Sequence, residues 1–451
     1  MTAPARTAAY HALQTISART HDLPAALAAS RRKLEDERDR ALAAEIVAGT
    51  LRWLRSLDFL IEHLAKRSVR QLDAEVVTIL RLSIYQLLHL DRVPASAVVD
   101  DAVDLTRAAR KPSAAGFVNA VLRSLLRQRH KLPLPSRPGT ASLELQREYL
   151  GITHSHPDWL VDRWLARHGF DATEAWARFN NETPALTLRV NTMNGSVDEA
   201  MRALERDGVE TERARYAPNA LVVTAGNPLR RPADGLVFVQ DEASQLVPLI
   251  VDPRPGERVL DLCASPGGKT TEMAALMRDS GTIVASDVRP RRMSLLERAV
   301  KTSGARAVQV QAIEPSGPLP FGADFDRVLV DAPCSGLGTI RRDPDIRWRR
   351  TAADLDRFAA QQIELLSRAA ATVRAGGRLV YATCSSEPEE NERVVEAFLA
   401  ANHDFALVNL ADETLPVTMT RLIDADGMFR TLPFRDRLEA FFAAALRRGT
   451  I

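Results

Sequence analysis

The sequence is poor in cysteine, with only three in 451 residues. Such a small, odd number argues against a disulfide-stapled extracellular scaffold and favours a reducing compartment. No apolar run reaches the roughly 18 residues that a membrane-spanning helix needs. The N-terminal residues also lack the charged-then-apolar pattern of a signal peptide. We therefore expect a cytoplasmic protein with no membrane partner.

Lysine is scarce as well, because almost all of the 60 basic residues are arginine. A lysine within a motif is therefore more informative than usual. Residues 1–150 hold 23 Lys and Arg against 16 Asp and Glu, whereas the remaining 301 residues hold 37 against 42, so that the formal net charge is only +2. This asymmetry fits an anionic partner such as nucleic acid, and it fits an ordinary solvated surface equally well.

The length of the chain and its changing periodicity predict several domains. Residues 1–130 form a helical domain in this interpretation, because apolar residues recur at helical spacing in residues 41–54, 76–90, 97–108 and 115–126. A proline-rich run opens a linker over residues 131–157. Residues 158–240 have the mixed pattern of a small α+β subdomain.

Residues 241–451 alternate apolar strand patterns with helical patterns. This alternation predicts a Rossmann-like α/β domain, with a mostly parallel sheet covered by helices on both faces. The expected strands are residues 258–263, 282–288, 307–313, 325–330 and 378–383, with a long helix over residues 352–373.

A paired histidine motif raises the question of a metal site. His154 and His156 flank a serine, but no further ligands stand near them, and the other histidines lack metal-ligand spacing with any cysteine. We expect no metal.

A glycine-rich turn follows the first strand of the α/β domain, in the run DLCASPGGKT from Asp261 to Thr270. Bare N–H groups at such a helix start favour a carboxylate or phosphate, but a P-loop would need glycine where Cys263 stands. The next strand ends at Asp287, where an acidic side chain typically accepts the two ribose hydroxyls of an adenosine. Lys269 offers a point charge for a carboxylate. An adenosine joined to an amino-acid carboxylate is S-adenosylmethionine, which fits this pair better than a dinucleotide.

All three cysteines fall at or just past the ends of predicted strands. A single cysteine there would most simply fill a core, but Cys334 stands in the run Asp331-Ala-Pro-Cys-Ser-Gly and Cys384 stands in the run Tyr381-Ala-Thr-Cys-Ser. Methylation of carbon 5 of a pyrimidine requires a thiolate that adds to carbon 6, an acid near N3, and a group that assists release. Cys384, Asp331 and Cys334 are the right residue types for these three tasks.

The motifs DLCASPGGKT, SDV, DAPCSG and YATCS together resemble those of the RNA cytosine-5 methyltransferases, in particular the bacterial 16S rRNA enzymes of the Sun/Fmu type. Residues 80–105 and 116–126 resemble the NusB-like helical domain of that family, which implies an RNA-binding role for residues 1–130. The resemblance implies S-adenosylmethionine-dependent formation of 5-methylcytosine in 16S rRNA, and we expect a monomer.

The resemblance also assigns roles to single residues. Cys384 would be the nucleophile, Cys334 would assist product release, and Asp331 would contact the pyrimidine edge and line the cofactor pocket; Lys269 completes the catalytic set. Asp287 would hold the ribose, and Arg189 and Asn191 would lie near the RNA. The loop that would wrap the methionine end of the cofactor is Cys263, Ala264, Ser265, Pro266, Gly267, Gly268 and Lys269.

Three departures from the family pattern stand out. Ser265 replaces an alanine, and the run Glu439-Ala-Phe-Phe replaces Asp-Gly-Phe-Phe. The third strand lacks the aspartate that usually holds the adenine amino group, for which a backbone contact or Glu314 could substitute. The missing aspartate keeps a non-catalytic RNA-binding ribosome-assembly factor open as an alternative. The residues also leave activity on tRNA or DNA open, although a nucleophile in the Thr-Cys-Ser run favours RNA.

Overall fold

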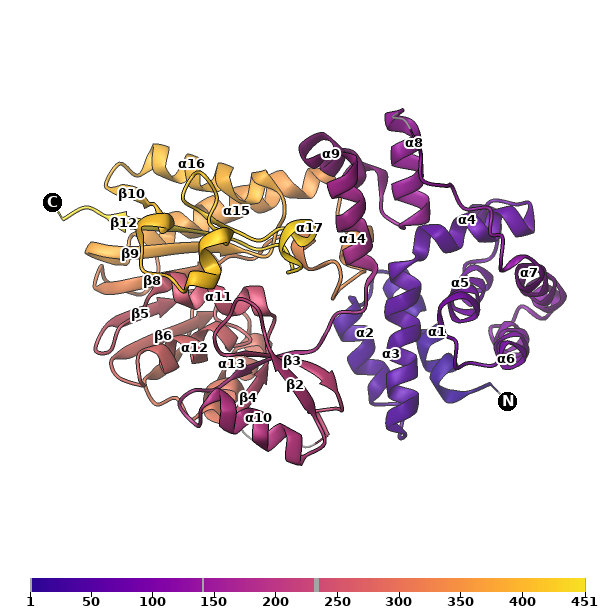
Figure 1. The fold of residues 1–451 in the computed structure, drawn as a ribbon, viewed down its shortest axis with the longest axis horizontal. Coiled ribbons are helices and arrows are strands. Elements are labelled where there is room, and N and C mark those ends of the chain that lie inside the picture. The colour runs from indigo at the N-terminus through magenta and orange to yellow at the C-terminus, as the bar shows by residue number, and fades with distance from the viewer. Residues whose placement is uncertain (1, 140–141, 231–234, 451) are drawn as a thin grey trace. The chain divides into compact units, whose positions relative to one another are not determined.

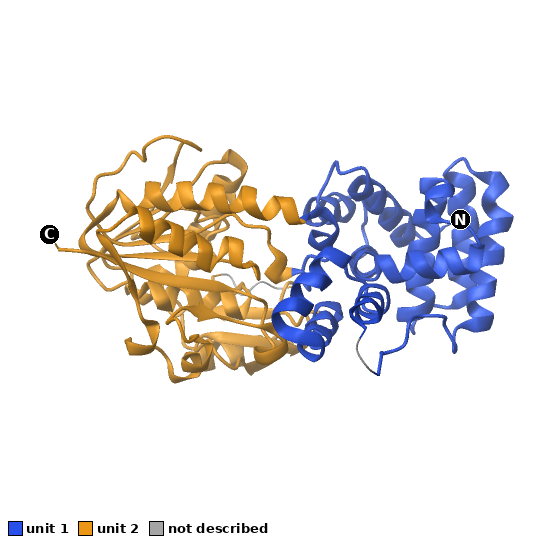
Figure 2. Ribbon diagram, turned by 90° about the horizontal axis from the view of Figure 1, so that it is seen from above, with its two compact units in different colours: residues 1–183, 340–351 blue, residues 184–339, 352–451 orange. Residues whose placement is uncertain are grey.

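The computed structural model describes residues 2–139, 142–230 and 235–450. The chain forms two compact units, unit 1 with residues 1–183 and 340–351, and unit 2 with residues 184–339 and 352–451 (Figure 2). Unit 2 therefore contains every motif to which we assign chemistry. Within the described ranges, no helix has both the length and the apolar character that a membrane crossing needs.

Unit 1 begins with seven helices around one apolar core. Buried side chains such as Ile46, Leu60, Ile79 and Leu122 belong to a single cluster, as expected when each helix carries an apolar stripe. The helical periodicity that we found in four segments is confirmed by α3, α5, α6 and α7. The helices are α1 (Pro4–Ser17), α2 (Leu23–Arg31), α3 (Glu37–Arg52), α4 (Leu54–Ala65), α5 (Ala74–His89), α6 (Ala95–Ala108) and α7 (Ala115–Gln128) (Figure 1).

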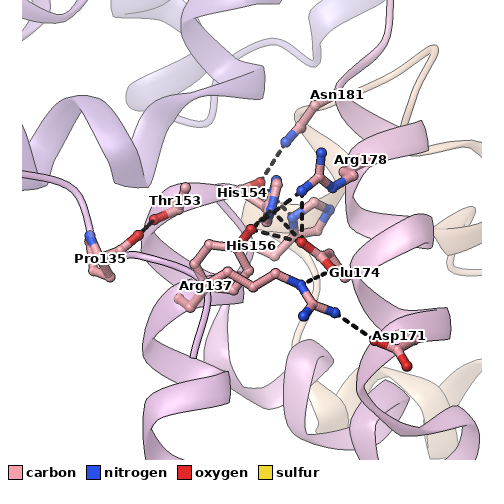
Figure 3. A network of polar contacts seen from close by, with 10 residues as sticks. Pro135, Arg137, Thr153, His154, His156, Asp171, Glu174, Arg178 and Asn181 are labelled. Carbon is pink, nitrogen blue, oxygen red and sulfur yellow. Dashed lines mark hydrogen bonds and ion pairs between the residues drawn. The ribbon is translucent and has the colours of Figure 1, made fainter. Parts of the chain in front are cut away.

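The rest of unit 1 contains α8 (Leu143–Glu148), α9 (Asp158–Asn181) and the short α14 (Ile346–Arg349). The segment before α8 is held by Arg137, which donates to Glu174 on α9 at 2.8 Å and to Asp171 at 2.6 Å (Figure 3). Glu174 also accepts hydrogen bonds from the Tyr149 hydroxyl at 2.7 Å and from Arg178 at 2.8 Å. Burial alone would raise the pKa of Glu174, but these donors lower it to about 2. The carboxylate therefore ties the segment before α8 to α9.

The two histidines of the paired motif lie in the same network (Figure 3). His154 Nε2 is 3.1 Å from the Tyr149 hydroxyl, and His156 Nδ1 is 2.7 Å from the His154 carbonyl oxygen. Burial lowers the pKa of His154 to about 4, so that the ring is neutral at ordinary pH. No group of three His, Cys, Asp or Glu suited to a metal occurs in the described part of the chain.

Residues 340–351 complete unit 1 through Arg347, whose side chain is fully buried. Its guanidinium donates to the carbonyl oxygens of Ser155 at 2.9 Å and Asn180 at 3.2 Å, and to the side-chain oxygen of Asn181 at 3.0 Å. The indole of Trp348 donates to the Leu51 carbonyl at 2.7 Å. This segment follows the Cys334 loop directly in the chain.

Unit 2 opens with a small antiparallel sheet of order β2-β3-β1-β4, backed by α10 (Val197–Arg206). Leu188, Ala200, Leu204 and Leu221 form its core. Ser196 caps α10 reciprocally with Glu199, the arrangement of a capping box. The strands are β1 (Thr187–Val190), β2 (Glu210–Arg213), β3 (Ala220–Ala225) and β4 (Val237–Val239). The first residues of the predicted α+β subdomain form α9 (Asp158–Asn181), which packs within unit 1.

The large sheet of unit 2 has the order β10-β12-β9-β8-β5-β6-β7. The five strands from β9 to β7 are parallel to one another, whereas β12 runs antiparallel to β9, and β10 runs antiparallel to β12. The five parallel strands confirm the strands that we predicted from the alternating pattern. The strands are β5 (Arg258–Asp261), β6 (Thr282–Asp287), β7 (Val308–Ala312), β8 (Phe325–Asp331), β9 (Val373–Thr383), β10 (Phe405–Val408), β11 (Phe429–Arg430) and β12 (Phe442–Arg448).

Both faces of the large sheet are covered, which explains its continuous apolar strands. Alternate residues of β9 point to opposite sides, with Val380 in the cluster that contains Leu246 and Met273, and Tyr381 in the cluster that contains Phe398. The first face is covered by α11 (Glu242–Val251) and α12 (Gly268–Leu276), the second by α15 (Ala352–Ala370) and α16 (Glu392–Ala401), and α13 (Pro290–Ser303) packs beside α12 (Figure 1). The carboxyl ends of the parallel strands meet at one edge, where open α/β sheets bind ligands.

Candidate active site

The glycine-rich turn between β5 and α12 brings the backbone close to its neighbours. Gly267 has a φ of +104°, and a Cβ there would lie 2.9 Å from the Ala299 side chain, so only glycine fits without strain. Thr270, in the first turn of α12, donates to Asp261 Oδ2 at 2.7 Å. Burial nevertheless raises the pKa of Asp261 to about 7. The turn thus presents a helix start at the carboxyl edge of the sheet.

Lys269 on α12 reaches across to the end of β8. Its Nζ donates to Asp331 Oδ2 at 2.7 Å, and the same nitrogen lies 5.7 Å from the centre of the Phe441 ring. Burial works against the positive charge of Lys269, but the neighbouring Asp331 carboxylate outweighs it and raises the pKa of the lysine. The structure thus brings together the predicted cofactor lysine and the predicted pyrimidine-binding aspartate as one ion pair.

A cavity of about 330 Å³ opens between the ends of β5, β6 and β8 and the helix α15; its lining residues do not include Lys269 or Asp331. Asp287 lines it from the end of β6. Asp287 Oδ1 accepts the backbone N–H of Val288 at 2.8 Å, whereas the buried Oδ2 accepts no hydrogen bond from the described residues and lies 3.7 Å from Arg292 Nη1 in an ion pair. The apolar part of the lining is formed by Leu262, Val288, Ile313, Pro315, Pro333 and Leu365.

Gln362 lines the same cavity, and its amide orientation is fixed by two acceptors. Its Nε2 donates to the Pro333 carbonyl at 3.0 Å and to Glu390 Oε1 at 3.1 Å. Gln362 Oε1 is therefore a second buried acceptor without a hydrogen-bond donor in the described residues. Glu314, which we considered as a substitute for the missing aspartate, is exposed and is not part of the cavity lining.

These residues fit S-adenosylmethionine. Two unsatisfied acceptors in an otherwise largely apolar pocket match a nucleoside, whose ribose hydroxyls and adenine amino group are donors. Cys263 also lines the cavity, and burial strongly raises the pKa of its thiol. Since a buried protonated thiol is a poor nucleophile, Cys263 is suited to the cofactor wall and not to covalent chemistry.

Cys334 and Cys384 lie on the loops that follow the adjacent strands β8 and β9. Their Sγ atoms are 3.3 Å apart and both side chains are partly buried. The hydrogen bond with Cys384 and burial together raise the pKa of Cys334, which favours its protonated form. Gly338 N donates to the Cys384 carbonyl at 2.9 Å, and a Cβ at Gly338 would lie 1.9 Å from the Ala440 carbonyl oxygen. The two thiol loops are thus in direct contact.

The run Glu439-Ala-Phe-Phe, one of the departures that we noted, leads into β12. Phe442 pairs with Thr383 at the end of β9, next to Cys384. Ala440 N donates to the Gly338 carbonyl at 3.0 Å. The substituted run therefore supports the two thiol loops from one side.

Arg189 and Asn191 are placed differently from our RNA-binding prediction. Arg189 is 1% exposed and donates to Gln240 and to Thr271, each at 2.7 Å. Asn191 is fully buried and donates to the carbonyl oxygens of Gly235 at 2.8 Å and Ser303 at 2.9 Å. These contacts join the small sheet to the α/β domain, and the burial of both side chains gives no support to direct contact with RNA.

Two residues of the site were missed by sequence reasoning, Gln362 and Glu390. Both are buried, although Gln362 sits on a long amphipathic helix and Glu390 sits in the polar run that follows Cys384. A polar residue on the apolar side of α15 was the only available signal for Gln362. For Glu390, a charged run after a strand reads as an exposed turn.

Comparison with known proteins agrees with this geometry. Residues 248–447 match the family described as 16S rRNA methyltransferase RsmB/F, residues 3–127 match the NusB family, and residues 156–230 match the ferredoxin-like domain of RsmF/B-like methyltransferases. A probable ribosomal RNA small subunit methyltransferase B of Bacillus subtilis (strain 168) is 32% identical over 416 residues, 91% of each chain. One from Synechocystis sp. is 35% identical over 91% of this chain and 92% of its own.

Solved structures show the same architecture. The crystal structure of PH0851 has a TM-score of 0.79 at 29% identity and covers 99% of both chains. A methyltransferase homolog protein from Pyrococcus horikoshii has a TM-score of 0.55 at 28% identity and covers 66% of this chain and 97% of its own. With a NusB-family helical domain, a ferredoxin-like subdomain and a methyltransferase domain in one chain, the protein belongs to the 16S rRNA methyltransferase RsmB/F family of S-adenosylmethionine-dependent enzymes.

Proposed function

We propose that this protein methylates carbon 5 of a cytosine in 16S rRNA, and that it does so through a covalent adduct with Cys384. The observation that carries the proposal is the contact between two thiols, 3.3 Å apart, at the ends of adjacent parallel strands, with Pro333, the residue before Cys334, lining the cavity. Carbon 5 of a pyrimidine is a weak nucleophile, so its methylation requires prior attack on carbon 6. A single buried cysteine would not provide both the attack and the release.

In this mechanism the Cys384 thiolate forms a bond to carbon 6, and the electron pair moves to carbon 5. S-adenosylmethionine supplies the electrophilic methyl group that carbon 5 attacks. Asp331 holds the N3 edge of the base, and Lys269 holds Asp331 through the 2.7 Å ion pair. Water then accepts the proton on carbon 5, the electron pair of that C–H bond restores the double bond between carbons 5 and 6, and the bond between carbon 6 and Cys384 Sγ breaks. Cys384 leaves as a thiolate, and the methylated product is released.

Cys334 assists the release step. A protonated thiol next to the nucleophile can return a proton to Cys384 when the bond to carbon 6 breaks, because the two sulfur atoms already share a hydrogen bond. The raised pKa of Cys334 supports this role, since it keeps the proton on that sulfur until it is needed.

The proposed cofactor-binding residues are the glycine-rich turn, of which Cys263 lines the cavity, and the two buried acceptors of the cavity wall. We infer that the loop from Cys263 to Lys269 holds the methionine end and that Asp287 Oδ2 accepts the ribose hydroxyls. We further infer that the adenine amino group donates to Gln362 Oε1, in place of the aspartate missing from β7. Both acceptors are buried and lack hydrogen-bond donors in the described residues, which supports the two assignments.

The helical domain is the proposed RNA-binding part. Its match to the NusB family and the excess of 23 basic over 16 acidic residues in residues 1–150 support this role. The relatives are named for action on small-subunit rRNA, so we propose 16S rRNA as the substrate and the cytoplasm as the location. The monomeric state remains our prediction from the sequence.

The test is to incubate the purified protein with S-adenosylmethionine carrying a deuterated methyl group and, separately, with 16S rRNA, 23S rRNA and bulk tRNA. Nucleosides are then analysed by mass spectrometry. We expect deuterated 5-methylcytidine from 16S rRNA and none from the Cys384→Ala variant. Label in a different nucleoside, or in tRNA alone, would contradict the proposed reaction or the proposed substrate.

A further inference from the structure

Glu390 is a fully buried carboxylate between the two thiol loops. It ends the turn η5 (Pro388–Glu390), which follows Cys384 by a few residues. A carboxylate out of contact with water is costly unless its oxygens accept several hydrogen bonds. Its partners therefore indicate why it is there.

Those partners are the two serines that follow the cysteines. Glu390 Oε1 accepts the backbone N–H of Ser335 at 2.7 Å, and Oε2 accepts the Ser335 hydroxyl at 2.5 Å. The same Oε2 accepts the Ser385 hydroxyl at 2.5 Å. Charge-assisted hydrogen bonds of this length are about twice as strong as neutral ones. One carboxylate therefore bridges the residue after Cys334 and the residue after Cys384.

The bridge itself is held from three directions. The Tyr381 hydroxyl donates to the Glu390 carbonyl at 2.6 Å. Asn391, the next residue, donates from Nδ2 to the Ser385 carbonyl at 3.0 Å and accepts from the Thr383 hydroxyl at 2.6 Å. Gln362 donates to Glu390 Oε1 from the wall of the cofactor cavity. The carboxylate cannot shift without moving β9, α15 or both.

The charge of Glu390 also acts on the Cys334 thiol. It is one of the influences that raise the pKa of Cys334, after the hydrogen bond to Cys384, burial and the charge of Cys384 itself. In the described residues, no lysine or arginine forms an ion pair with Glu390 that would offset the effect of its negative charge on Cys334. The arrangement favours a protonated Cys334 in contact with Cys384.

We propose that Glu390 is a positioning residue that sets the distance between the two thiols, by holding Ser335 and Ser385 on one carboxylate. The claim about the distance between the two sulfur atoms does not depend on which reaction the protein catalyses. The effect of that distance on turnover rests on the proposed function. Loss of the bridge separates Cys334 from Cys384, so that the bond to carbon 6 forms but breaks slowly. Glu390 does not touch the substrate.

The first measurement reports geometry alone. In a Cys263→Ala background, which leaves only Cys334 and Cys384, the protein is equilibrated with glutathione and glutathione disulfide, and unreacted thiols are alkylated and counted by mass spectrometry. Each Cys334–Cys384 disulfide formed reduces one glutathione disulfide to two glutathiones, so the equilibrium gives the effective concentration of one thiol at the other. We expect Glu390→Gln to lower this effective concentration at least about tenfold. The exposed control Glu396→Gln should leave the effective concentration within about twofold of the parent value.

The second measurement reports the chemistry. With S-adenosylmethionine and 16S rRNA, Glu390→Gln should accumulate a protein–RNA adduct that survives denaturing electrophoresis. A merely structural defect would lower adduct formation instead. Addition of Cys384→Ala should abolish the adduct.

The outcomes separate the two ideas. If the effective concentration falls but no variant, nor the parent protein, forms an adduct or methylates RNA, the result would support the bridge and reject the proposed function. An unchanged effective concentration in both Glu390→Gln and Ser385→Ala would overturn the bridge, because the glutamine NH₂ group can still donate to the two serine hydroxyls. If Glu390→Gln does not fold, as judged by circular dichroism, Ser385→Ala removes one hydrogen bond to the carboxylate. It should lower the effective concentration about threefold, and an unchanged value would overturn the proposal.

Discussion

The affinity for the cofactor should depend strongly on Asp287. The substitution Asp287→Asn removes the proposed ribose acceptor while it keeps the other side-chain oxygen. The side chain is 4% exposed, and its two oxygens have different tasks. Oδ1 caps the turn after β6 by accepting the N–H groups of Val288 at 2.8 Å and Arg289 at 3.3 Å. Asparagine retains an oxygen at this position, so the turn is preserved. Oδ2, the acceptor proposed for the ribose, becomes an NH₂ group.

The magnitude follows from that exchange. A hydrogen bond to a charged group contributes about 1.5–3 kcal/mol, and each 1.4 kcal/mol or so corresponds to about a tenfold change in the dissociation constant. Asp287→Asn should therefore weaken S-adenosylhomocysteine binding by about 10- to 100-fold, without lowering the thermal midpoint of unfolding. Isothermal titration calorimetry measures the affinity, with Asp356→Asn on the exposed side of α15 as the matched control. A change within about twofold would refute the assignment of Asp287 to the ribose.

Two further predictions concern buried polar groups. Burial raises the pKa of Glu272 to about 8, so the folded state favours its protonated form. Its contribution to stability is present at low pH and is lost as the pH rises through about 8. Urea unfolding at several pH values should show that the free energy of unfolding falls by a few kcal/mol, in order of magnitude, from pH 5 to pH 9. The fall should be smaller in Glu272→Gln. An equal fall in the parent protein and in Glu272→Gln would contradict the assignment to Glu272. Gln362→Met should weaken S-adenosylhomocysteine binding about tenfold and should remove discrimination against S-inosylhomocysteine, which has no amino group. Retained discrimination would reject Gln362 as the adenine acceptor.

The parallel strands and the thiol loops were predictable because their signals are local. An apolar run that stops at Asp287, Asp331 or Cys384 contains both the strand and its functional end within a few residues. In a parallel sheet, the carboxyl ends meet at one edge regardless of the details of the loops. The proximity of these residues therefore follows from the pattern alone.

The remaining features depend on contacts between distant parts of the chain. Glu390 is buried because Ser335, 55 residues earlier, supplies its donors. Arg189 looks like an accessible residue at a strand end, but Thr271 on α12, 82 residues later, accepts its hydrogen bond and helps to bury it. The strand β12 reads as a short apolar tail until its pairing with β9 is known. No local pattern encodes these partners.

The central claim is that Cys384 forms a covalent bond to the RNA and that Cys334 is needed to break it. The most direct test is denaturing gel electrophoresis of the Cys334→Ala variant after incubation with S-adenosylmethionine and labelled 16S rRNA. The proposed mechanism predicts a slow-migrating protein–RNA band that is absent from the Cys334→Ala/Cys384→Ala double variant. Normal turnover by Cys334→Ala, with no such band, would contradict the assignment of the two thiols.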